Sequence, residues 1–422
     1  MATASATPAT RRSGLAVAPN IGALAAGAAC LVLVAAATAT AWPESSPLVP
    51  EHDAADGGWA WAYLVLAAAA FAAYLVGLLL LERGRERRAG AVVALACAIQ
   101  LVPLAGPVLL STDVYTYWDY GRIGAVHGGN PYADEPSSYP EDPAYPLMGA
   151  QWRDTTSAYG PGFTLASEGH AAAVGDSPDA AAWTYKVLAA AAMIALVLLA
   201  ARLGRRPAYA AAFVGWNPLL AVHFAGGGHN DAFMMALVLG ALALAAAGRR
   251  VLAGAAWALA AAVKWVPLLF LPLRALEARR HGRRVDHLGF AATAAIVVVV
   301  ASWRYGADWL GAFGPIGDNL VNERAAYSIP VRVSGLLGIP EGAAVAIFVG
   351  LFVLGYLWLL REAWRGRARL GLTAGLLLVT TSWLLPWYAV WAVPLAAIEE
   401  DRAARWLALG LSAYLLRDAV PL

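Results

Sequence analysis

Cysteine and charge are both scarce in this chain of 422 residues. Its two cysteines, Cys30 and Cys97, lie inside apolar segments, so the sequence predicts neither a disulfide framework nor a zinc site. Charged residues make up only 14% of the chain, and the basic ones are confined to short stretches between apolar runs. The net charge of +2 therefore gives no indication of a nucleic-acid partner, and none is predicted. An internal repeat of the kind found in two-fold transporters is also not evident.

Long apolar runs are what the sequence has in abundance. Hydrophobic residues make up 60% of the chain, and the runs have the length, roughly 20 residues, that crosses a bilayer as a helix. The expected spans are residues 21–42, 59–81, 89–111, 181–202, 208–225, 231–248, 286–303, 342–360 and 370–386. With the less regular C-terminal region added, the sequence predicts an all-α polytopic membrane protein of roughly 10 to 12 transmembrane helices.

Arginine clusters predict how these spans are oriented. They lie at residues 83–88, 202–206, 249–250, 274–284 and 361–369. By the positive-inside rule these stretches face the cytoplasm. The segments between them should face outward, and residues 43–58 contain no Lys or Arg, while residues 112–182 contain ten carboxylates against two arginines. Residues 112–180 are therefore predicted to be a large first extracytoplasmic loop, ordered as a cap by its Pro, Gly and aromatic content.

Two regions leave the topology open. Arg11 and Arg12 precede an apolar stretch that ends in a sequence typical of a signal-peptidase site at 39–41, although an uncleaved first helix is favoured. Residues 251–273 lie between two arginine clusters, so a single crossing would place one cluster outside. We expect instead a hairpin that enters and leaves on the cytoplasmic side, broken near "VKWVPLL", since Pro267 cannot continue a helix without a kink.

These features divide the chain into six segments. The first is an N-terminal helix, a possible signal anchor, with an acidic outer loop, and the large loop follows the next two helices. A transmembrane core, a second extracytoplasmic loop and the C-terminal helices complete the chain. The predicted boundaries are 1–58, 59–111, 112–180, 181–303, 304–340 and 341–422.

The large loop begins with "STDVYTYWDYGR". On a helix, Tyr117 and Tyr120 share the face of Asp113, while Asp119 lies about 120° away and is expected to pair with Arg122 at i,i+3. On spacing alone two interpretations remain open. Asp113 either caps a helix beside an interfacial aromatic belt, or it acts as a base at the outer end of the expected span 89–111.

Two further motifs place polar groups in apolar surroundings. "HFAGGGHND" sets His229, Asn230 and Asp231 directly before an apolar helix, where a simple helix cap and a phosphate site at a helix N-terminus both fit. Lys264 in "AAVKWVPLL" has no carboxylate nearby in the sequence. It either snorkels to a lipid headgroup or contacts an anionic lipid substrate.

Together with "GGNPYADEP", "WRDTTSAYGPGF" and "LPWYAVWAVPL", these motifs resemble the GT-C superfamily of polyprenyl-phosphate-sugar glycosyltransferases. The resemblance is greatest to actinobacterial polyprenol-phosphomannose-dependent alpha-1,6-mannosyltransferases, covers about residues 105–400, and rests on the order of the motifs. It implies a GT-C type bundle in the plasma membrane with its active site on the extracytoplasmic side. It also implies inverting transfer of mannose from polyprenyl phosphate to a mannan or glycolipid acceptor. The chain is short for that family at its C-terminal end.

The resemblance and the expected chemistry assign roles to individual residues. Asp113 is the expected general base, which takes the proton of the acceptor hydroxyl. The residues expected to hold the donor phosphate or lipid are Lys264, Arg332, His229, Asn230 and Asp231. Those expected to contact the sugar or the acceptor are Tyr117, Arg122, Asn130, Tyr132, Trp152, Asp154, Tyr159, His223, Trp387 and Tyr388. The scheme requires no metal and no cofactor besides the donor substrate.

Three other functions compete with this interpretation. A polyprenyl-linked-sugar flippase or transporter would place polar residues near the bilayer midplane, whereas here the carboxylates cluster at helix ends and in the large loop. A GT-C enzyme that uses another sugar, such as arabinose, fits the same motifs. So does a catalytically inactive relative that binds lipid or protein. The sequence predicts no particular oligomeric state.

Overall fold

The computed structural model describes residues 18–52, 56–84, 88–283, 285, 287–312 and 325–422. Arg11 and Arg12, parts of the arginine clusters at 83–88 and 274–284, and residues 313–324 of the second expected loop lie outside these residues. Within the described ranges all regular structure is helical, which confirms the all-α class.

The helices divide between the two halves of the chain. The first half contains α1 (Ala18–Ala39), α2 (Gly57–Arg83), α3 (Ala89–Leu101), α4 (Asp113–Ala125), α5 (Pro161–Val174), α6 (Pro178–Leu203), α7 (Pro207–Gly215) and α8 (Pro218–Ala221). The second half contains α9 (Asp231–Ala246), α10 (Arg250–Val263), α11 (Phe270–Arg280), α12 (His287–Tyr305), α14 (Ile329–Leu337), α15 (Glu341–Trp364), α16 (Leu370–Thr380), α17 (Ala389–Ile398) and α18 (Arg402–Tyr414). Short segments of tighter or wider helix are η1 (Val102–Ala105), η2 (Pro136–Ser138), η3 (Ala150–Trp152), η4 (Val222–Gly226), η5 (Val266–Leu269), η6 (Asp308–Ala312), η7 (Pro386–Tyr388) and η8 (Leu415–Arg417).

Five of the described helices, α1, α2, α6, α12 and α15, are long and apolar enough to cross a membrane. The segment Pro218–Gly226 and α9 meet at 115° and count as a sixth span if they cross as one broken element. The shorter apolar helices are Ala89–Ala105, Arg250–Val263, Leu370–Thr380 and Pro386–Ile398. The chain is therefore a multi-pass membrane protein, as predicted, and the expected 10 to 12 crossings are reached only if the short helices are included.

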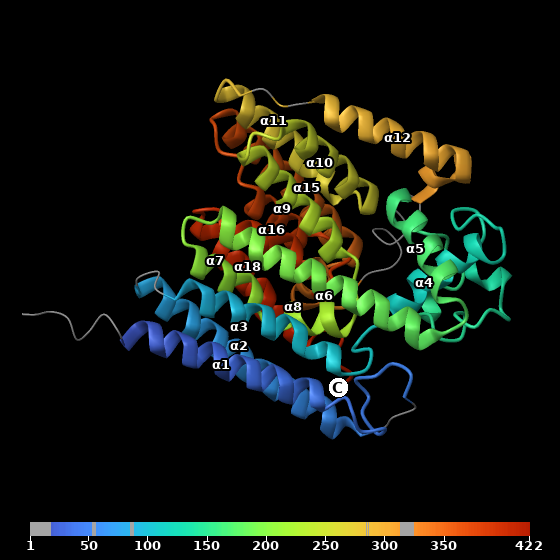
Figure 1. Cartoon of the computed structure of the whole chain (residues 1–422), viewed down its shortest axis with the longest axis horizontal. Coiled ribbons are helices and arrows are strands. Elements are labelled where there is room, and N and C mark those ends of the chain that lie inside the picture. Colours follow the sequence, from blue (N-terminus) through green and yellow to red (C-terminus); the bar gives the residue numbers. More distant parts are fainter. Residues whose placement is uncertain (1–17, 53–55, 85–87, 284, 286, 313–324) are drawn as a thin grey trace, which may run out of the picture.

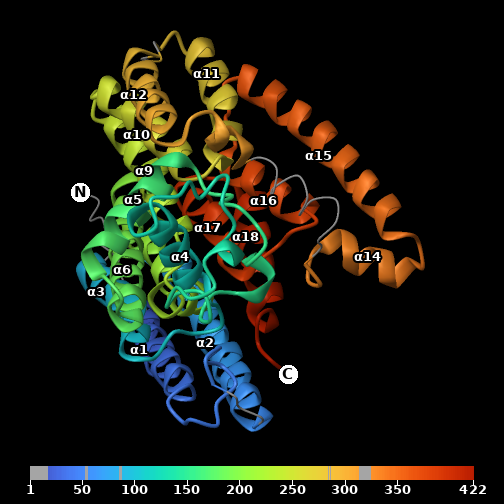
Figure 2. The ribbon, with the colours of Figure 1, turned by 90° about the vertical axis from the view of Figure 1, so that its right-hand side faces the viewer.

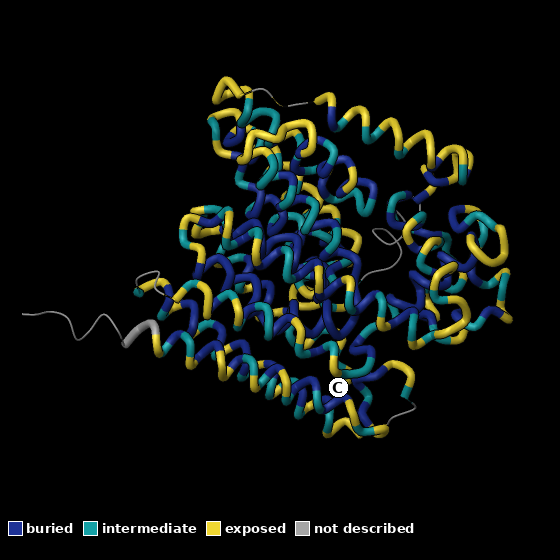
Figure 3. The backbone as a smooth tube through the Cα atoms, viewed as in Figure 1, coloured by how far each residue is buried: buried dark blue, intermediate teal, exposed yellow. Residues whose placement is uncertain are grey.

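The centre of the bundle is formed by α6, α7, α9 and α17, and α7 and α17 are almost entirely buried there (Figure 3). Helices α1 and α2 lie side by side along one face with α3 next to them (Figure 1). Helices α4 and α5 and the turns between them form a cap, residues 113–174, at one end of the bundle (Figure 1). Helices α14 and α15 stand at the edge of the molecule (Figure 2). The apolar exposed surface of α12 and α15 suits contact with lipid.

The third expected span ends early, which corrects the predicted position of Asp113. Residues 106–112 are not helical. Lys186 of α6 donates hydrogen bonds to the carbonyl oxygens of Gly106 and Pro107, so this irregular backbone is satisfied inside the protein. Asp113 consequently lies in the first turn of α4, at the start of a helix and not at the end of an outgoing one.

Two further expected spans, 208–225 and 370–386, are interrupted at prolines. Pro218 and Pro386 each begin a short new helix after an extended residue. Proline suits the first turn of a helix because its missing N–H has no partner to lose there. These breaks bring non-helical backbone and its polar groups into the bundle, close to the cap.

The break predicted within residues 251–273 is present, and it separates two helices. Helix α10 ends at Val263, Lys264 is extended, and α11 begins at Phe270 after η5. Helix α12 follows α11 after a short link, and its Gly289 packs directly on Val251 at the start of α10. The hairpin therefore enters and leaves at the same end of the bundle, with Lys264 at its tip.

Candidate active site

A cavity of about 790 Å³ lies between the cap and the bundle. The motifs around Asp113, Lys264 and Trp387, which are far apart in the sequence, meet in its wall. Residues 151–159 of the cap line another side. The cavity is thus a place where several of the sequence motifs singled out above meet.

Asp113 enters this cavity from the N-terminus of α4. Thr112 is the residue before the first turn, and the hydroxyl oxygen of Ser111 accepts a hydrogen bond from the Asp113 N–H at 3.2 Å. A carboxylate in the first turn is stabilised by the helix dipole. The cap interpretation and the base interpretation of Asp113 are therefore compatible, because the side chain is still 14% exposed to the cavity.

Two donors hold one oxygen of this carboxylate. His229 Nδ1 lies 3.1 Å from Asp113 Oδ2, and the Tyr117 hydroxyl donates to the same oxygen at 3.2 Å. Burial raises the pKa of the Asp113 carboxyl, but these hydrogen bonds and the positive charge of Lys264 outweigh that effect and leave the pKa below its usual value. Asp113 is therefore ionised at neutral pH and able to accept a proton.

Lys264 lies at the tip of the α10–α11 hairpin and faces the same cavity. Its ammonium group donates to Asp231 Oδ1 at 2.8 Å and lies over the rings of Tyr388 at 4.8 Å and Trp391 at 5.5 Å. A lysine has three N–H donors, so the pair with Asp231 leaves donors for a ligand. Its partly exposed side chain, at 17%, is placed to bind an anion in the cavity.

Aromatic rings make up much of the remaining wall. Trp387 stacks on His229 with ring centroids 3.7 Å apart, and Tyr388 stacks on Trp391 at 4.1 Å. On the cap side, Trp152 meets Trp383 edge-on at 6.0 Å. Such rings offer flat apolar faces suited to sugar rings or to a lipid chain.

The cavity continues into an apolar wing next to the hairpin tip. Leu268 and Leu269 of η5, Leu377 of α16 and Leu385 line this part. Leu268 is exposed on the molecular surface. The cavity therefore combines a polar end at Asp113 and Lys264 with an apolar end formed by leucines.

The "YGPG" motif fixes the cap to the hairpin. The Gly160 N–H donates to the Val263 carbonyl at 3.1 Å, and a Cβ added at Gly160 would lie 2.2 Å from the Ala262 carbonyl oxygen. No other residue fits at this close approach. The motif thus holds the cap against the residue that precedes Lys264.

The predicted site residues fall into three groups. Those that line the cavity are Asp113, Tyr117, Trp152, Tyr159, Lys264, Trp387 and Tyr388. Those that are buried behind its wall are His223, His229, Asn230 and Asp231. A direct contact of the second group with a donor phosphate is not supported by this placement, because their side chains are shielded from the cavity.

The third group lies away from the cavity. Asn130 donates to Asp308 Oδ2 at 2.9 Å, and the Tyr132 hydroxyl donates to the Tyr159 carbonyl at 2.9 Å, so both organise the cap. Asp154 is exposed in a turn. Arg332 is exposed on α14 with its guanidinium 4.3 Å from the Tyr327 ring centre. Arg122, discussed next, completes this group.

The predicted ion pair between Asp119 and Arg122 is wrong. Arg122 pairs with Asp142 at 2.8 Å and with Asp176 at 2.7 Å, and His127 shares Asp142 at 2.6 Å. Asp142 lies in a later turn of the cap and Asp176 lies just after α5, so an argument from helical spacing could not find them. Arg122 therefore ties α4 to the rest of the cap and does not face the cavity.

The ionisation of Asp119 should make the free energy of unfolding depend on pH. Burial, with Asp142 nearby, raises the pKa of Asp119 to about 7. The folded state then holds a proton that the unfolded chain releases, so the free energy of unfolding should fall as the pH rises from about 4 to about 7. The effect should be at most about 4 kcal/mol and absent in Asp119→Asn. Unfolding curves at pH 5 and pH 8 measure it, and parallel pH profiles for the two proteins would contradict it.

Several residues that line the cavity are not among the site residues predicted from the sequence. Gln151 directly precedes the motif that begins at Trp152, and Trp383 and Trp391 lie next to or within the aromatic, proline-broken segment. Asp418, near the C-terminus, is next to no such motif. Among the described residues no group of three or more His, Cys, Asp or Glu side chains is placed to hold a metal ion.

Comparison with known proteins gives consistent matches. The sequence model of the family "Alpha-(1->6)-mannopyranosyltransferase, N-terminal domain" matches residues 22–280. Alpha-(1->6)-mannopyranosyltransferase A of Mycobacterium tuberculosis is 29% identical over 388 residues, which cover 81% of this chain and 73% of that protein. The protein of the same name in Corynebacterium glutamicum is 27% identical, with coverage of 75% and 72%. A probable alpha-(1->6)-mannopyranosyltransferase of Mycolicibacterium smegmatis is 28% identical, with coverage of 70% and 62%. No solved structure matches the chain.

Proposed function

The chain belongs to the alpha-(1->6)-mannopyranosyltransferase family, and from this premise we propose that it transfers mannose from a polyprenyl-phosphate donor to a glycan or glycolipid acceptor, with inversion at the anomeric carbon. That it is a glycosyltransferase follows from the family. The observation that supports the specific reaction is one cavity with an ionised carboxylate, a lysine and an apolar wing.

Asp113 is the base in this proposal. The acceptor hydroxyl oxygen attacks the anomeric carbon and forms the new glycosidic bond, while its proton passes to the Asp113 carboxylate. The bond between the anomeric carbon and the phosphate oxygen breaks, and its electron pair leaves with the polyprenyl phosphate. Attack opposite the leaving group converts a beta-linked donor into an alpha-linked product. No metal and no cofactor takes part in this scheme.

Lys264 stabilises the departing phosphate. The leaving group carries its negative charge without protonation, so it needs a positive group within reach as the bond breaks. Lys264 is the cation among the residues that line the cavity, and its side chain is held beside Asp231 and two aromatic rings. Arg332 lies outside the cavity wall and is not assigned this role.

The two ends of the cavity accommodate the two parts of the donor. The apolar wing of Leu268, Leu269, Leu377 and Leu385 suits a polyprenyl chain that reaches the site from the bilayer. The aromatic rings of Trp152, Trp383 and Trp387 suit sugar rings of the donor and the acceptor. The phosphate then lies between these two ends, at Lys264.

The active site faces the extracytoplasmic side of the plasma membrane in this proposal, which cysteine labelling can test. Cys30 is buried and Cys97 half-buried, so the wild-type background should be low. Exposed Glu141, in the cap, and exposed Arg283, after α11, lie on opposite sides by the arginine rule. In intact cells an impermeant maleimide should label Glu141→Cys and spare Arg283→Cys. Both should react in detergent. Labelling of Arg283→Cys from outside would contradict the orientation.

A lipid-linked-sugar flippase is the rival function that the apolar wing also fits. Vesicles that contain the purified protein, polyprenyl-phosphate-mannose and an external mannoside acceptor separate the two. We expect mannosylated acceptor to form at a rate that exceeds any protein-dependent exchange of donor between leaflets. Rapid exchange without mannosyl transfer would favour the flippase. A pentose donor such as polyprenyl-phosphate-arabinose, used in the same assay, tests the sugar.

A further inference from the structure

We propose that the turn formed by residues 229–231 positions both reacting groups of the cavity, His229 by orienting Asp113 and Asp231 by holding Lys264. This inference rests on the proposed function. It replaces the expected contact of His229 and Asp231 with the donor phosphate by a role behind the cavity wall. Both are positioning residues, because neither lines the cavity.

The turn lies at a break in the bundle. It joins η4 to α9, where the chain bends by 115°, and its three side chains are fully buried. From this one place the chain reaches both functional groups. His229 points to the start of α4, and Asp231 points to the tip of the α10–α11 hairpin.

His229 gives the two oxygens of Asp113 different roles. Oδ2 accepts hydrogen bonds from His229 Nδ1 at 3.1 Å and from the Tyr117 hydroxyl at 3.2 Å. The Tyr117 oxygen in turn accepts the Asn230 N–H at 3.4 Å. Oδ1 has no hydrogen-bond partner among the described residues, and the side chain borders the cavity. Oδ1 is therefore left as the oxygen that accepts the proton.

The imidazole itself is held rigidly. Its ring stacks on Trp387 with an interplanar angle of 14°, and Gly227 lies so close that an added Cβ would be 3.0 Å from His229 Nε2. Nε2 is buried and has no partner in the described part of the chain. A bare ring nitrogen costs less there than an unpaired N–H, which favours the tautomer with its hydrogen on Nδ1, toward Asp113.

Asp231 fixes the cation in a similar way. Its Oδ1 accepts from Lys264 Nζ at 2.8 Å and from the Trp391 indole N–H at 2.6 Å. Trp391 stacks on Tyr388, and both rings lie under the ammonium group. Lys264 is thereby held at one point in the wall, where an unpaired lysine would sample many rotamers.

The groups that surround Asp113 come from several elements. They are Tyr117 and Tyr120 of α4, Tyr159 before α5, His229 and Asp231 of the turn, Lys264 after α10 and Tyr388 of η7. Of these groups, His229, Lys264 and Tyr117 lower the pKa of Asp113. Loss of the His229 donor should therefore raise that pKa, whereas loss of Asp231 acts on Lys264 first.

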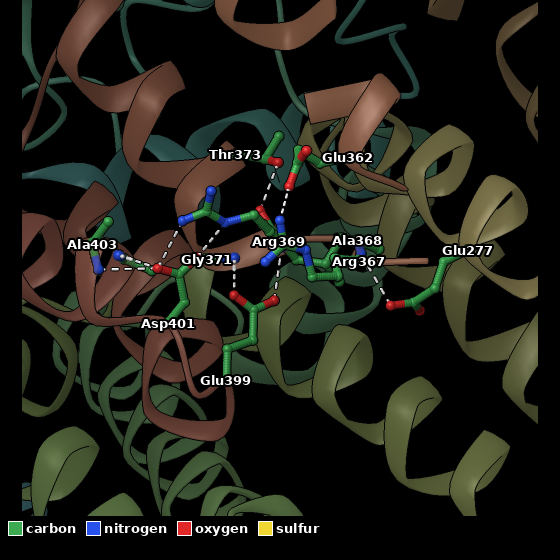
Figure 4. Close-up of polar contacts among 12 residues, drawn as sticks. Glu277, Glu362, Arg367, Ala368, Arg369, Gly371, Thr373, Glu399, Asp401 and Ala403 are labelled. Carbon is green, nitrogen blue, oxygen red and sulfur yellow. Dashed lines mark hydrogen bonds and ion pairs between the residues drawn. The ribbon is translucent and has the colours of Figure 1, made fainter. Parts of the chain in front are cut away.

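A matched control lies at the other end of the bundle. There Arg369 donates to Asp401 at 2.6 and 3.0 Å, as Figure 4 shows. A second cavity lies beside Arg369 and Asp401, and Leu242, near the end of α9, also lines it. Asp231, in contrast, is the first residue of α9. Asp401→Asn therefore removes a carboxylate partner of a basic residue a helix length away from the proposed site.

The first test uses His229→Phe, which keeps a flat ring on Trp387 but removes the donor. We expect kcat to fall roughly 10- to 100-fold with little change in the donor KM. The acid limb of the kcat profile should move to higher pH. His170→Phe, which changes a histidine whose ring is tilted by 45° against that of Tyr185 outside the cavity wall, should do neither. A wild-type kcat and acid limb in His229→Phe would overturn the proposal.

A second comparison does not depend on the folding of the phenylalanine variant. His229→Asn keeps an N–H donor near the position of Nδ1, whereas His229→Ala keeps none. We expect the Asn variant to retain at least several-fold more kcat than the Ala variant, with its acid limb nearer to that of the wild type. Equal values for the two would mean that the hydrogen bond does not matter.

The Asp231 half is tested by Asp231→Asn, which keeps an acceptor for Trp391 but removes the charge beside Lys264. The donor KM should rise roughly 10-fold while the acid limb stays in place. Asp401→Asn should change the thermal midpoint only. An unchanged donor KM in Asp231→Asn would overturn this half. If Asp113→Asn kept full activity, the base assignment itself would be wrong, whatever the variants of the turn do.

Discussion

Asp113→Asn is expected to lower kcat by roughly 10²- to 10⁴-fold and to leave the KM for the lipid donor close to that of the wild type. The substitution keeps the size of the side chain and its position in the first turn of α4, but an amide cannot take the proton of the acceptor hydroxyl. The donor contacts at Lys264 and in the apolar wing are unchanged. Steady-state rates of mannosyl transfer at saturating donor give the comparison.

The control for this substitution is Glu141→Gln, an exposed carboxylate in the same cap. It removes one negative charge from the cap but does not line the cavity. It should keep the wild-type kcat. A wild-type kcat in Asp113→Asn, or an equal loss in Glu141→Gln, would show that the proton goes elsewhere.

Lys264→Met should have the second large effect, a loss of affinity for the lipid donor. Methionine keeps an unbranched side chain of similar length but offers the phosphate no charge and no N–H donor. We expect the donor KM to rise roughly 10- to 100-fold, with the acceptor KM unchanged. A smaller fall in kcat should accompany it, because the leaving phosphate also loses its positive partner.

Lys186→Met is the matched control for that variant. Lys186 is the other lysine of the chain, and it is buried in α6, where it binds the backbone carbonyls of Gly106 and Pro107. Its loss should lower the thermal midpoint without a change in donor KM. Unchanged donor binding in Lys264→Met would remove the phosphate role from Lys264 and leave it a structural partner of Asp231.

Local spacing predicted some of the site correctly. Helical periodicity placed Tyr117 and Tyr120 on the face of Asp113, and both line the same cavity. Arginine clusters required a hairpin at residues 251–273, and its break falls at Lys264 and η5. These predictions succeeded because each depends on neighbours a few residues apart or on charge along the chain.

The contacts that organise the site could not be predicted in that way. His229 meets Asp113 across 116 positions, and Asp231 meets Lys264 across 33. Periodicity carries no information about such pairs, so the sequence indicates only a helix cap or a phosphate site at this turn. The Asp119–Arg122 pair failed for the same reason, since Arg122 found Asp142 in a distant turn of the cap.

Apolar composition also does not reveal where a helix breaks. Apolar composition indicated one continuous span through residues 89–111, although the helix stops before residue 106. Hydropathy shows whether a segment is apolar, but it does not show where a helix ends. Here Lys186 satisfies the carbonyl groups that the break leaves without helical partners. That partner lies in α6, about 80 positions away from the break in the sequence.

The most direct test of the account is the product of the purified protein in lipid nanodiscs. It would be supplied with polyprenyl-phosphate-beta-mannose and a synthetic mannoside acceptor, and the new linkage would be identified by NMR. We predict an alpha-linked mannose on the acceptor, with one polyprenyl phosphate released for each bond formed, and loss of both in Asp113→Asn. A beta-linked product, or no transfer by a folded protein that binds the donor, would contradict the proposed reaction.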